Sequence, residues 1–259
     1  MDLSSIARQL LSARQSATTL APPSDASTDF SLADGYTVGK MLAEQRITAG
    51  DESVGVKLGF TNTTAWESLG ISDPFWAPMY DTSVSGDHDV SLAGLMQPRI
   101  EPEIVLGFDK ALPAGTPAAE VAGAVTWIAL GFEIVHCHFP GWQMTAADAI
   151  ADFGLHAQLL LGPRHAPADG EVDGLPGVQV TLRQGAEEAA TGTGANTLGG
   201  PVAAVERLLQ LPGYPGLGAG AMVTTGTLTA AQPLVVGQEW TQVTSGLTGP
   251  SELSIRTTE

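Results

Sequence analysis

From residue 53 onward the sequence falls into short apolar runs, which Gly, Pro, Asp and Ser interrupt at close intervals. This pattern is typical of a fold built mainly from strands, either all-β or an α+β roll. The spacing of the glycines has no fixed period, so no internal repeat is expected. Two helical segments interrupt the β pattern, at residues 118–125 and 201–211. The predicted strands cover residues 53–59, 100–108, 127–135, 157–161, 178–183, 222–225 and 234–236.

The first 52 residues have a helical pattern instead. An amphipathic helix is predicted over residues 4–15, with Ser4 or Ser5 as its N-cap. A second helix is predicted to begin near Ser31 and to end at about residues 49–50. The fold class that follows is α+β: a helical N-terminal arm, residues 1–52, and a mostly β domain built as a roll or barrel, residues 53–259.

Composition limits the partners of this chain. It has 28 acidic and 11 basic residues, a formal net charge of -17, so electrostatic binding to nucleic acid or to an anionic membrane is not expected. An anionic substrate would need a local cation, either a bound metal or one of the few Lys and Arg side chains. The single cysteine, Cys137, allows no intrachain disulfide. With no apolar run of about 18 residues and no signal-peptide pattern, a soluble cytoplasmic protein is expected.

Two glutamates lie inside the apolar run IEPEIVLGF at residues 100–108. Side chains alternate along a strand, so Glu101 and Glu103 point to the same side. Like charges placed side by side destabilise a strand unless both are in water or a cation lies between them. The apolar flanks favour burial, and a buried anion pair takes up a proton or a metal. Pro102 favours a strand edge or a bulge, which keeps the solvated alternative open.

A third acid, Glu133, lies in the apolar run WIALGFEIV without a basic residue nearby in the sequence. Together with Glu101 and Glu103 it would form a hard-oxygen site suited to Mg²⁺ or Mn²⁺. Such a site leaves roughly three of about six coordination positions for water or a chelating substrate. The alternative is that Glu133 faces solvent at a sheet edge.

Lys57 lies in a comparable apolar setting, between Val56 and Leu58. A lysine buried beside a metal site would have a lowered pKa and could bind a substrate carboxylate or transfer a proton. The alternative is an edge-strand lysine whose stem covers apolar surface while its ammonium group stays in water.

Several segments carry a family resemblance that extends over almost the whole chain. They resemble the 2-keto-4-pentenoate hydratase and 4-oxalocrotonate decarboxylase group within the fumarylacetoacetate hydrolase superfamily. The PRIE-x-E motif with the downstream glutamate is the specific part, whereas the glycine turns are weak. The matching segments are GVKLGFTN at 55–62, QPRIEPEI at 97–104, GFEIV at 131–135, ADAIADFG at 147–154, LGGP at 198–201 and VTTGTL at 223–228.

This resemblance implies a β-rich fold in which Glu101, Glu103 and Glu133 hold a divalent metal, Mg²⁺ or Mn²⁺. It also implies a small anionic 2-oxo or 2-hydroxy acid as substrate, chelated through its carboxylate and C2 oxygen, with Lys57 at the active site. Asp81, in MYDTS, is a weaker candidate for proton transfer, and Thr225 could contact the substrate carboxylate.

The activity implied by the resemblance is a hydratase that adds water to a 2-hydroxy-2,4-dienoate and forms a 4-hydroxy-2-oxo acid in aromatic-compound catabolism. Three alternatives stay open: a decarboxylase of a 2-oxo-3-enedioate, an acylpyruvate-type C–C hydrolase, and a non-catalytic partner subunit. A homo-oligomer is expected, with a related pathway enzyme as a further candidate partner.

The chain departs from the family pattern in two places. Residues 152–154 read Asp-Phe-Gly where the group commonly has Asp-Asn, which removes an amide. His136 and His138 lie two apart and are expected to be hydrogen-bonded structural residues, with proton transfer or recognition of a distal carboxylate as the alternative. His156 and Arg99 are similar cases, and Arg99 could neutralise part of the acid cluster.

Overall fold

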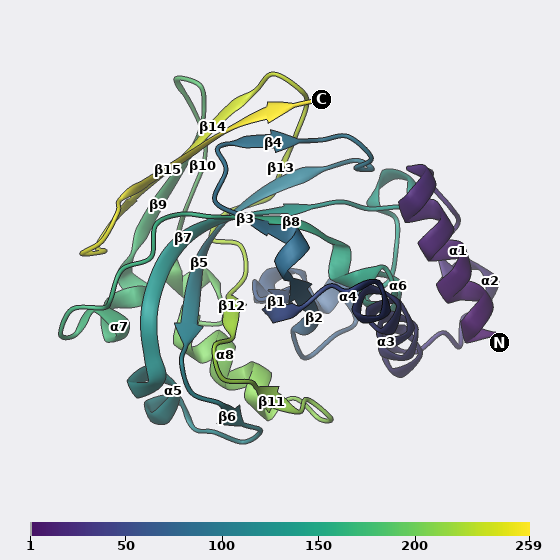
Figure 1. Ribbon diagram of the computed structural model, residues 1–259, viewed down its shortest axis with the longest axis horizontal. Coiled ribbons are helices and arrows are strands. Elements are labelled where there is room, and N and C mark those ends of the chain that lie inside the picture. Colours follow the sequence, from purple (N-terminus) through teal and green to yellow (C-terminus); the bar gives the residue numbers. More distant parts are fainter. Residues whose placement is uncertain (1) are drawn as a thin grey trace.

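A curved eight-stranded sheet forms the centre of the protein in the computed structural model, which describes residues 2–259 (Figure 1). Its strands follow the order β2-β1-β12-β5-β7-β8-β3, and β13 pairs with β5 outside this path. The two long central strands, β5 and β7, are antiparallel neighbours. The strands of this sheet are β1 (Ser53–Gly59), β2 (Phe75–Tyr80), β3 (Val84–Ser85), β5 (Arg99–Phe108), β7 (Val125–Val135), β8 (His156–Leu161), β12 (Met222–Thr224) and β13 (Gln232–Pro233).

A second sheet, with five strands in the part of the chain described, has the order β10-β9-β14-β15-β4. It lies at the upper left of Figure 1. The two sheets bury a shared core, to which the central sheet contributes Ile100 and Phe132 and the second sheet Trp240 and Ile255. The strands are β4 (Asp89–Ser91), β9 (Gln179–Gln184), β10 (Glu187–Thr193), β14 (Glu239–Ser245) and β15 (Glu252–Thr258), with β6 (Leu112–Pro113) and β11 (Gly216–Leu217) forming a separate pair.

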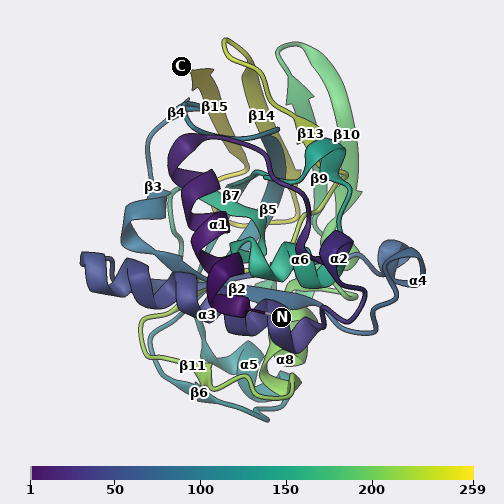
Figure 2. The same cartoon turned by 90° about the vertical axis from the view of Figure 1, so that its right-hand side faces the viewer.

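Three N-terminal helices, α1 (Leu3–Ser16), α2 (Pro23–Ala26) and α3 (Leu32–Ala49), lie together at one side of the molecule (Figures 1 and 2). Helix α3 begins at Ser31, which forms a capping box with Asp34, and ends at Gly50 in the left-handed conformation, as predicted. The N-cap prediction for α1 was wrong. Asp2 is the cap, because its carboxylate accepts the Ser5 N–H while both serines already lie in the first turn.

The other helices cover the ends and edges of the sheets. Helix α8 buries Ala204, Val205, Leu208 and Leu209 against the apolar face of the central sheet, and α6 packs between α3 and that sheet. These helices are α4 (Trp66–Leu69), α5 (Ala118–Ala124), α6 (Ala146–Ala151), α7 (Glu171–Gly174) and α8 (Pro201–Gln210), and the 3₁₀ turns are η1 (Thr63–Ala65), η2 (Asp81–Ser83), η3 (Pro140–Trp142), η4 (Phe153–Leu155), η5 (Leu175–Gly177) and η6 (Gly194–Asn196).

The predicted fold class is confirmed: the protein is α+β, and the predicted strands lie mainly in the central sheet. The prediction of a strand at residues 234–236 was wrong. Leu234 is buried beside β13, but Val235 and Val236 are 59% and 51% exposed in the turn that follows, so this apolar run is no strand. Among residues 2–259, no helix combines the length and the apolar character needed to cross a bilayer.

Pro102 lies in the interior strand β5, although proline is expected at edges. Its carbonyl accepts the Leu228 N–H on the side away from β7. The N–H and C=O of one strand residue point the same way, so the donor that proline lacks faces the irregular segment after β12. The ladder between β5 and β7 therefore loses no hydrogen bond at this position.

Truncating Leu208 tests the packing of α8. Leu208 is fully buried in the core cluster that α8 shares with β5. Leu208→Ala is expected to lower the free energy of unfolding by about 2–5 kcal/mol, since it removes buried methyl groups and leaves a cavity. Urea unfolding measures this change. If the free energy of unfolding falls by less than about 1 kcal/mol, the site collapses around the smaller side chain, which would contradict close packing between α8 and β5.

Candidate metal and active site

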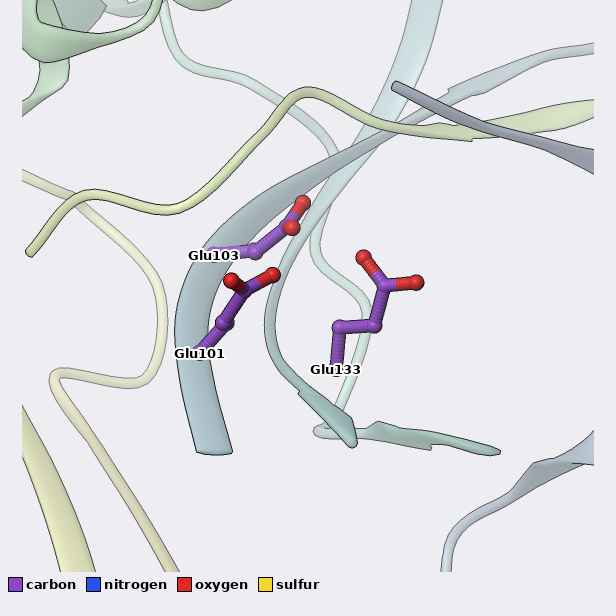
Figure 3. A group of neighbouring side chains, drawn as sticks. All are labelled: Glu101, Glu103 and Glu133. Atoms are coloured by element: carbon purple, nitrogen blue, oxygen red, sulfur yellow. The ribbon is translucent and has the colours of Figure 1, made fainter. Parts of the chain in front are cut away.

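Strands β5 and β7 bring the three predicted glutamates together (Figure 3). Glu101 is the direct cross-strand partner of Glu133, and Glu103 lies opposite Gly131, where a Cβ would lie 2.7 Å from the Val105 side chain. One carboxylate oxygen from each glutamate lies within 4.8 Å of the others. The spacing of the acids in β5, together with the register of β7, therefore creates one cluster of three carboxylates.

The cluster is buried on the face of β5 and β7 opposite the core that the two sheets share. Glu103 and Glu133 are fully buried and Glu101 is partly exposed. Gly226 N–H donates to Glu103 Oε2 at 2.9 Å. Glu103 Oε1 and Glu133 Oε2, however, are buried without any hydrogen-bond partner. Buried carboxylate oxygens are costly without a partner, so this pair points to a cation.

The residues present fit a hard divalent cation. Their donors are all carboxylate oxygens, which Mg²⁺ and Mn²⁺ prefer. The predicted alternatives, with the acids solvated at an edge, do not hold for Glu103 and Glu133, which are fully buried. We therefore assign Glu101, Glu103 and Glu133 as the group that would hold the metal.

Lys57 and His156 both contact Glu133. Lys57 Nζ lies 3.4 Å from Glu133 Oε1, and His156 Nδ1 lies 2.8 Å from the same oxygen. Lys57 also donates to the Gly154 carbonyl at 2.9 Å and is only 3% exposed, which excludes an ammonium group in water. His156 Nε2 in turn lies 3.1 Å from Ser83 Oγ. The Lys57 ammonium group and the hydrogen bond from His156 thus already balance part of the charge of Glu133.

The pKa values of the three acids diverge for this reason. Burial, and next the charge of Glu133, raise the pKa of Glu101 to about 7. The same causes raise the pKa of Glu103 well above its ordinary value. For Glu133 burial acts in the same direction, but Lys57 and His156 outweigh it and lower the pKa. Without a cation, the cluster therefore holds protons at neutral pH.

The pKa of Glu101 predicts how the stability of the metal-free protein depends on pH. A carboxyl whose folded pKa of about 7 exceeds its ordinary 4.5 is destabilised when ionised, so stability falls as pH rises through 7. The melting temperature in EDTA is therefore expected to fall from about pH 5 to pH 7.5 and to level off above, and the part of the fall between pH 6.5 and 7.5 lies above the ordinary pKa of histidine. Mg²⁺ should restore more stability at pH 8 than at pH 6.5. Glu101→Gln is the control and should flatten the slope; an unchanged slope in that variant would contradict the assignment.

A cavity of about 200 Å³ opens beside the cluster. Lys57 and Glu101 are its charged lining residues, and the hydroxyl of Thr61, which also lines it, is buried without a hydrogen-bond partner. A Cβ on Gly226, whose φ is +103°, would lie 1.8 Å from that hydroxyl, so glycine is required there. The other lining residues are neutral: Leu58, Gly59, Phe60, Asn62, Thr64, Phe75, Val135, Trp142, Leu155, Thr227, Thr229, Ala230 and Ala231.

Two predicted site residues lie apart from the cavity lining. Asp81 is exposed in η2, where its carboxylate accepts the Glu52 N–H at 2.9 Å. Thr225 is buried next to Gly226, but its hydroxyl donates to the Ile104 carbonyl at 2.9 Å. The structure therefore does not bring Asp81 to the acid cluster, and it gives the Thr225 hydroxyl a partner in the backbone.

The two neighbouring histidines are hydrogen-bonded, as expected. His138 Nδ1 lies 2.9 Å from Asp152 Oδ2, and His136 Nε2 lies 3.0 Å from Arg14 Nη1. Burial lowers the pKa of His136 well below its ordinary value, with the charge of Arg14 next in effect. Arg14 and Asp152 therefore each anchor one ring, while His136 Nδ1 and His138 Nε2 are buried without a hydrogen-bond partner.

Arg99 stacks on an aromatic ring at the cavity. Its guanidinium carbon lies 4.2 Å from the centre of the Trp142 ring, and Trp142 lines the cavity. Within residues 2–259 no carboxylate lies within ion-pair distance of Arg99, but its charge lowers the pKa of Glu101. Its effect on the cluster is long-range.

Sequence reasoning missed Thr61 and Arg14. Thr61 belongs to the GVKLGFTN segment and could have been considered from that position alone. Arg14 contacts Asp152, which is 138 residues away in the sequence, so no local pattern reveals it.

Comparisons with known proteins extend these observations. No family model matches the chain. The 2-keto-4-pentenoate hydratase of Paraburkholderia xenovorans (strain LB400) is 30% identical over 227 residues, which are 86% of this chain and 83% of that protein. The chain belongs to the 2-keto-4-pentenoate hydratase and 4-oxalocrotonate decarboxylase family. A 4-oxalocrotonate decarboxylase from Pseudomonas sp is 31% identical over 77% of this chain and 78% of its own length. This hydratase and decarboxylase family consists of enzymes, and the predicted resemblance is confirmed.

Solved structures show the same fold. The 4-oxalocrotonate decarboxylase from Pseudomonas putida G7, complexed with magnesium and adipate, has a TM-score of 0.91 at 24% identity and covers 98% of this chain and 97% of its own. A putative fumarylacetoacetate isomerase/hydrolase from Oleispira antarctica has a TM-score of 0.61 at 17% identity, over 79% of this chain and 93% of its own. The family fold is thus present over nearly the whole chain, the N-terminal helices included.

Proposed function

We propose that the protein is a Mg²⁺-dependent hydratase that converts a 2-hydroxy-2,4-dienoate into a 4-hydroxy-2-oxo acid in aromatic-compound catabolism. The observation that supports this most directly is the pair of buried, unpartnered carboxylate oxygens on Glu103 and Glu133, next to a cavity that Lys57 lines. These carboxylates need a cation to balance their negative charge. A cation bound there could in turn be chelated by an anionic substrate in the cavity.

Glu101, Glu103 and Glu133 would hold the metal. Bound Mg²⁺ would act as a Lewis acid toward the substrate carboxylate and C2 oxygen, which lowers the cost of negative charge there. Mn²⁺ has the same ligand preference and is the alternative ion. The protein's contribution is a rigid, largely buried set of ligands on two paired strands.

Lys57 is the residue we propose for proton transfer. Its ammonium group has three donors, of which one bonds the Gly154 carbonyl and one faces Glu133 Oε1. The third is available to the cavity, which Lys57 lines. Burial among apolar side chains and nearby dipoles holds this group at one position, which general acid–base catalysis requires.

The reaction adds one water and needs no oxidant or reductant. First, the 2-hydroxyl loses its proton and C5 gains one, which converts the dienoate into a 2-oxo-3-enoate. Water oxygen then bonds to C4 and a proton reaches C3, which gives the 4-hydroxy-2-oxo acid. Lys57 would move the proton at the C2 oxygen, and the unpartnered Thr61 hydroxyl would donate to the substrate carboxylate.

The remaining wall of the cavity favours hydration over decarboxylation. Beyond Lys57 and Glu101 it consists of neutral side chains, among them Phe60, Ala230 and Ala231. A second carboxylate at the distal end of a substrate would lie there without a charged partner on the wall. An uncharged distal group, as in the substrate that names the 2-hydroxyhexa-2,4-dienoate hydratase of Comamonas testosteroni, suits this wall better; that protein is 28% identical over 93% of this chain.

One observation favours the decarboxylase as a second candidate. Arg99, stacked on Trp142 at the cavity, is a cation without a carboxylate at ion-pair distance in the described chain and could reach a distal carboxylate by leaving the ring. The 31% identity to a 4-oxalocrotonate decarboxylase is consistent with this candidate.

A paired assay separates the two candidates. Wild-type protein with Mg²⁺ is incubated with 2-hydroxypenta-2,4-dienoate while the loss of diene absorbance is followed, and in parallel with 2-oxo-3-hexenedioate while CO₂ is measured. We expect the dienoate to be hydrated, and we expect EDTA to abolish this reaction. Little CO₂ should be released from 2-oxo-3-hexenedioate. Release of CO₂ without hydration would replace the hydratase by the decarboxylase, and silence in both would reject both.

We further propose that the protein self-associates, that it is cytoplasmic, and that a domain boundary lies between residues 52 and 53. Exposed Val235 and Val236 support self-association as apolar surface. The single cysteine, Cys137, is free, which agrees with a reducing compartment. For the domain boundary, the support is the change from helix α3 to strand β1 between residues 49 and 53.

A further inference from the structure

Arg14, near the end of helix α1, makes three polar contacts with residues 152–156 and one with His136, all far away in the sequence. Its Nε donates to Asp152 Oδ1 at 3.0 Å and its Nη2 to the Asp152 carbonyl at 2.5 Å. Its Nη1 reaches the His156 carbonyl at 3.4 Å and His136 Nε2 at 3.0 Å. The guanidinium group therefore holds both residue 152 and residue 156, so it spans the segment between them.

The segment that Arg14 spans has an unusual backbone. Phe153, Gly154 and Leu155 have φ values of 59°, 62° and 62°, which places three consecutive residues in the left-handed region. Residues with a side chain rarely adopt this conformation and keep it only where the surrounding structure enforces it. Gly154 is also tightly packed, since a Cβ there would lie 2.7 Å from the Ala77 side chain.

Asp152, at the start of this left-handed turn, is held from two sides. It is fully buried, with Arg14 on one side and the backbone N–H and ring Nδ1 of His138 on the other. The ring of Phe153 lies below the guanidinium group, 5.6 Å from its carbon. These contacts are the local interactions that can enforce the left-handed turn.

The left-handed turn leads directly to the acid cluster. The Gly154 carbonyl, at its centre, accepts the hydrogen bond from Lys57 Nζ at 2.9 Å. His156, directly after it, places its ring 2.8 Å from Glu133 Oε1. The groups that contact Glu133 from this side are therefore both positioned by the backbone that Arg14 holds.

We propose that Arg14 is a positioning residue of the active site: by holding residues 152 and 156 it fixes the Gly154 carbonyl, and through it the ammonium group of Lys57. This inference rests on the proposed function, in which Lys57 moves a proton. Without Arg14 the turn can relax toward negative φ, the Gly154 carbonyl rotates away, and the Lys57 ammonium moves toward Glu133. Arg14 contacts none of the three acids, so their places on β5 and β7 are kept and the change reaches Glu133 only through Lys57 and His156.

The test replaces Arg14 by methionine, which has a similar length and no donors. We expect kcat for dienoate hydration to fall about 10- to 100-fold, while KM and the Mg²⁺ dissociation constant stay within about 3-fold. Guanidine at millimolar concentration should restore part of kcat, because methionine fills the place of the arginine stem and leaves vacant only that of the guanidinium donors. The kcat of Arg14→Lys should lie between those of the wild type and Arg14→Met. If Arg14→Met does not fold, the same measurements are made on Arg14→Lys.

Arg46 provides the matched control. It lies on α3, forms an ion pair with Asp51 at 2.6 Å, and its guanidinium carbon lies 5.8 Å from the same Phe153 ring, yet it touches neither Asp152 nor His156. Arg46→Met is expected to lower the melting temperature with kcat unchanged. The proposal is overturned if Arg14→Met behaves in the same way, or if both variants lose the same factor in kcat.

A crystal structure of Arg14→Met separates this proposal from the proposed function. Positioning predicts that the φ values of residues 153–155 change and that the distance from Lys57 Nζ to the Gly154 carbonyl exceeds hydrogen-bond range. An unchanged turn would reject the role of Arg14 whatever the enzyme turns over. If the wild type does not turn over the dienoate but the turn is altered in Arg14→Met, the hydratase proposal is rejected and the positioning role of Arg14 is kept.

Discussion

Replacing Glu103 with glutamine is expected to lower Mg²⁺-dependent turnover on the order of 10³-fold. Glu103 supplies one of three metal-binding carboxylates, and one of its oxygens is buried without any other partner. Lewis-acid stabilisation by a metal contributes several kcal/mol to the transition state, and about 1.4 kcal/mol corresponds to a factor of ten. Steady-state rates at saturating Mg²⁺, together with the Mg²⁺ dissociation constant from calorimetry, measure the effect.

The fold should survive this change. Glutamine has the size of the protonated glutamate and cannot ionise beside Glu101 and Glu133, so the melting temperature of Glu103→Gln in EDTA is expected to equal or exceed that of the wild type. Glu239, exposed on β14 and paired with Arg256, is the control, and Glu239→Gln should leave both rate and metal affinity unchanged. Full activity of Glu103→Gln would remove Glu103 from the metal site.

Replacing Lys57 with methionine is the second large change. Lys57 is buried, lines the cavity and donates to the Gly154 carbonyl, so methionine keeps the stem and loses only the ammonium group. Turnover is expected to fall about 10²- to 10⁴-fold, the range typical of general acid–base groups. Mg²⁺ should still bind, because the unpartnered oxygens of Glu103 and Glu133 are retained.

The readouts for Lys57→Met are kcat, the Mg²⁺ dissociation constant and the circular dichroism spectrum. Lys110, exposed after β5, is the matched control, and Lys110→Met should behave as wild type. If Lys57→Met loses its fold, Lys57 is mainly a structural partner of Glu133. If it keeps wild-type turnover, proton transfer must be assigned to another group.

The acid triad could be predicted because each part of it is a local signal. Strand alternation places Glu101 and Glu103 on one face, and a lone acid in an apolar run identifies Glu133. The direct pairing of Glu101 with Glu133 depends on the register of β5 and β7, which no single strand contains. The three acids in apolar runs already indicated one hard-oxygen site from the sequence, and the family resemblance implied the same three residues.

The wrong strand prediction shows that tertiary packing decides between local alternatives, whereas the wrong N-cap prediction for α1 has a local cause, because Asp2 precedes both serines. Residues 234–236 are apolar enough for a strand, yet Val235 and Val236 follow the end of β13 at the surface. The end of α1 shows the opposite case, in which an unremarkable arginine, Arg14, becomes central only when the fold brings residues 152–156 beside it. Contacts between residues so far apart in the sequence produce no periodic pattern from which they could be predicted.

The central claim is that Glu101, Glu103 and Glu133 hold one divalent cation. Crystals grown with Mn²⁺ and measured for anomalous scattering test it most directly. The claim predicts a single strong anomalous peak within about 2.5 Å of a carboxylate oxygen of each of the three glutamates. A cluster without such a peak at saturating Mn²⁺, with Lys57 Nζ bonded to the oxygens that now lack partners, would contradict it.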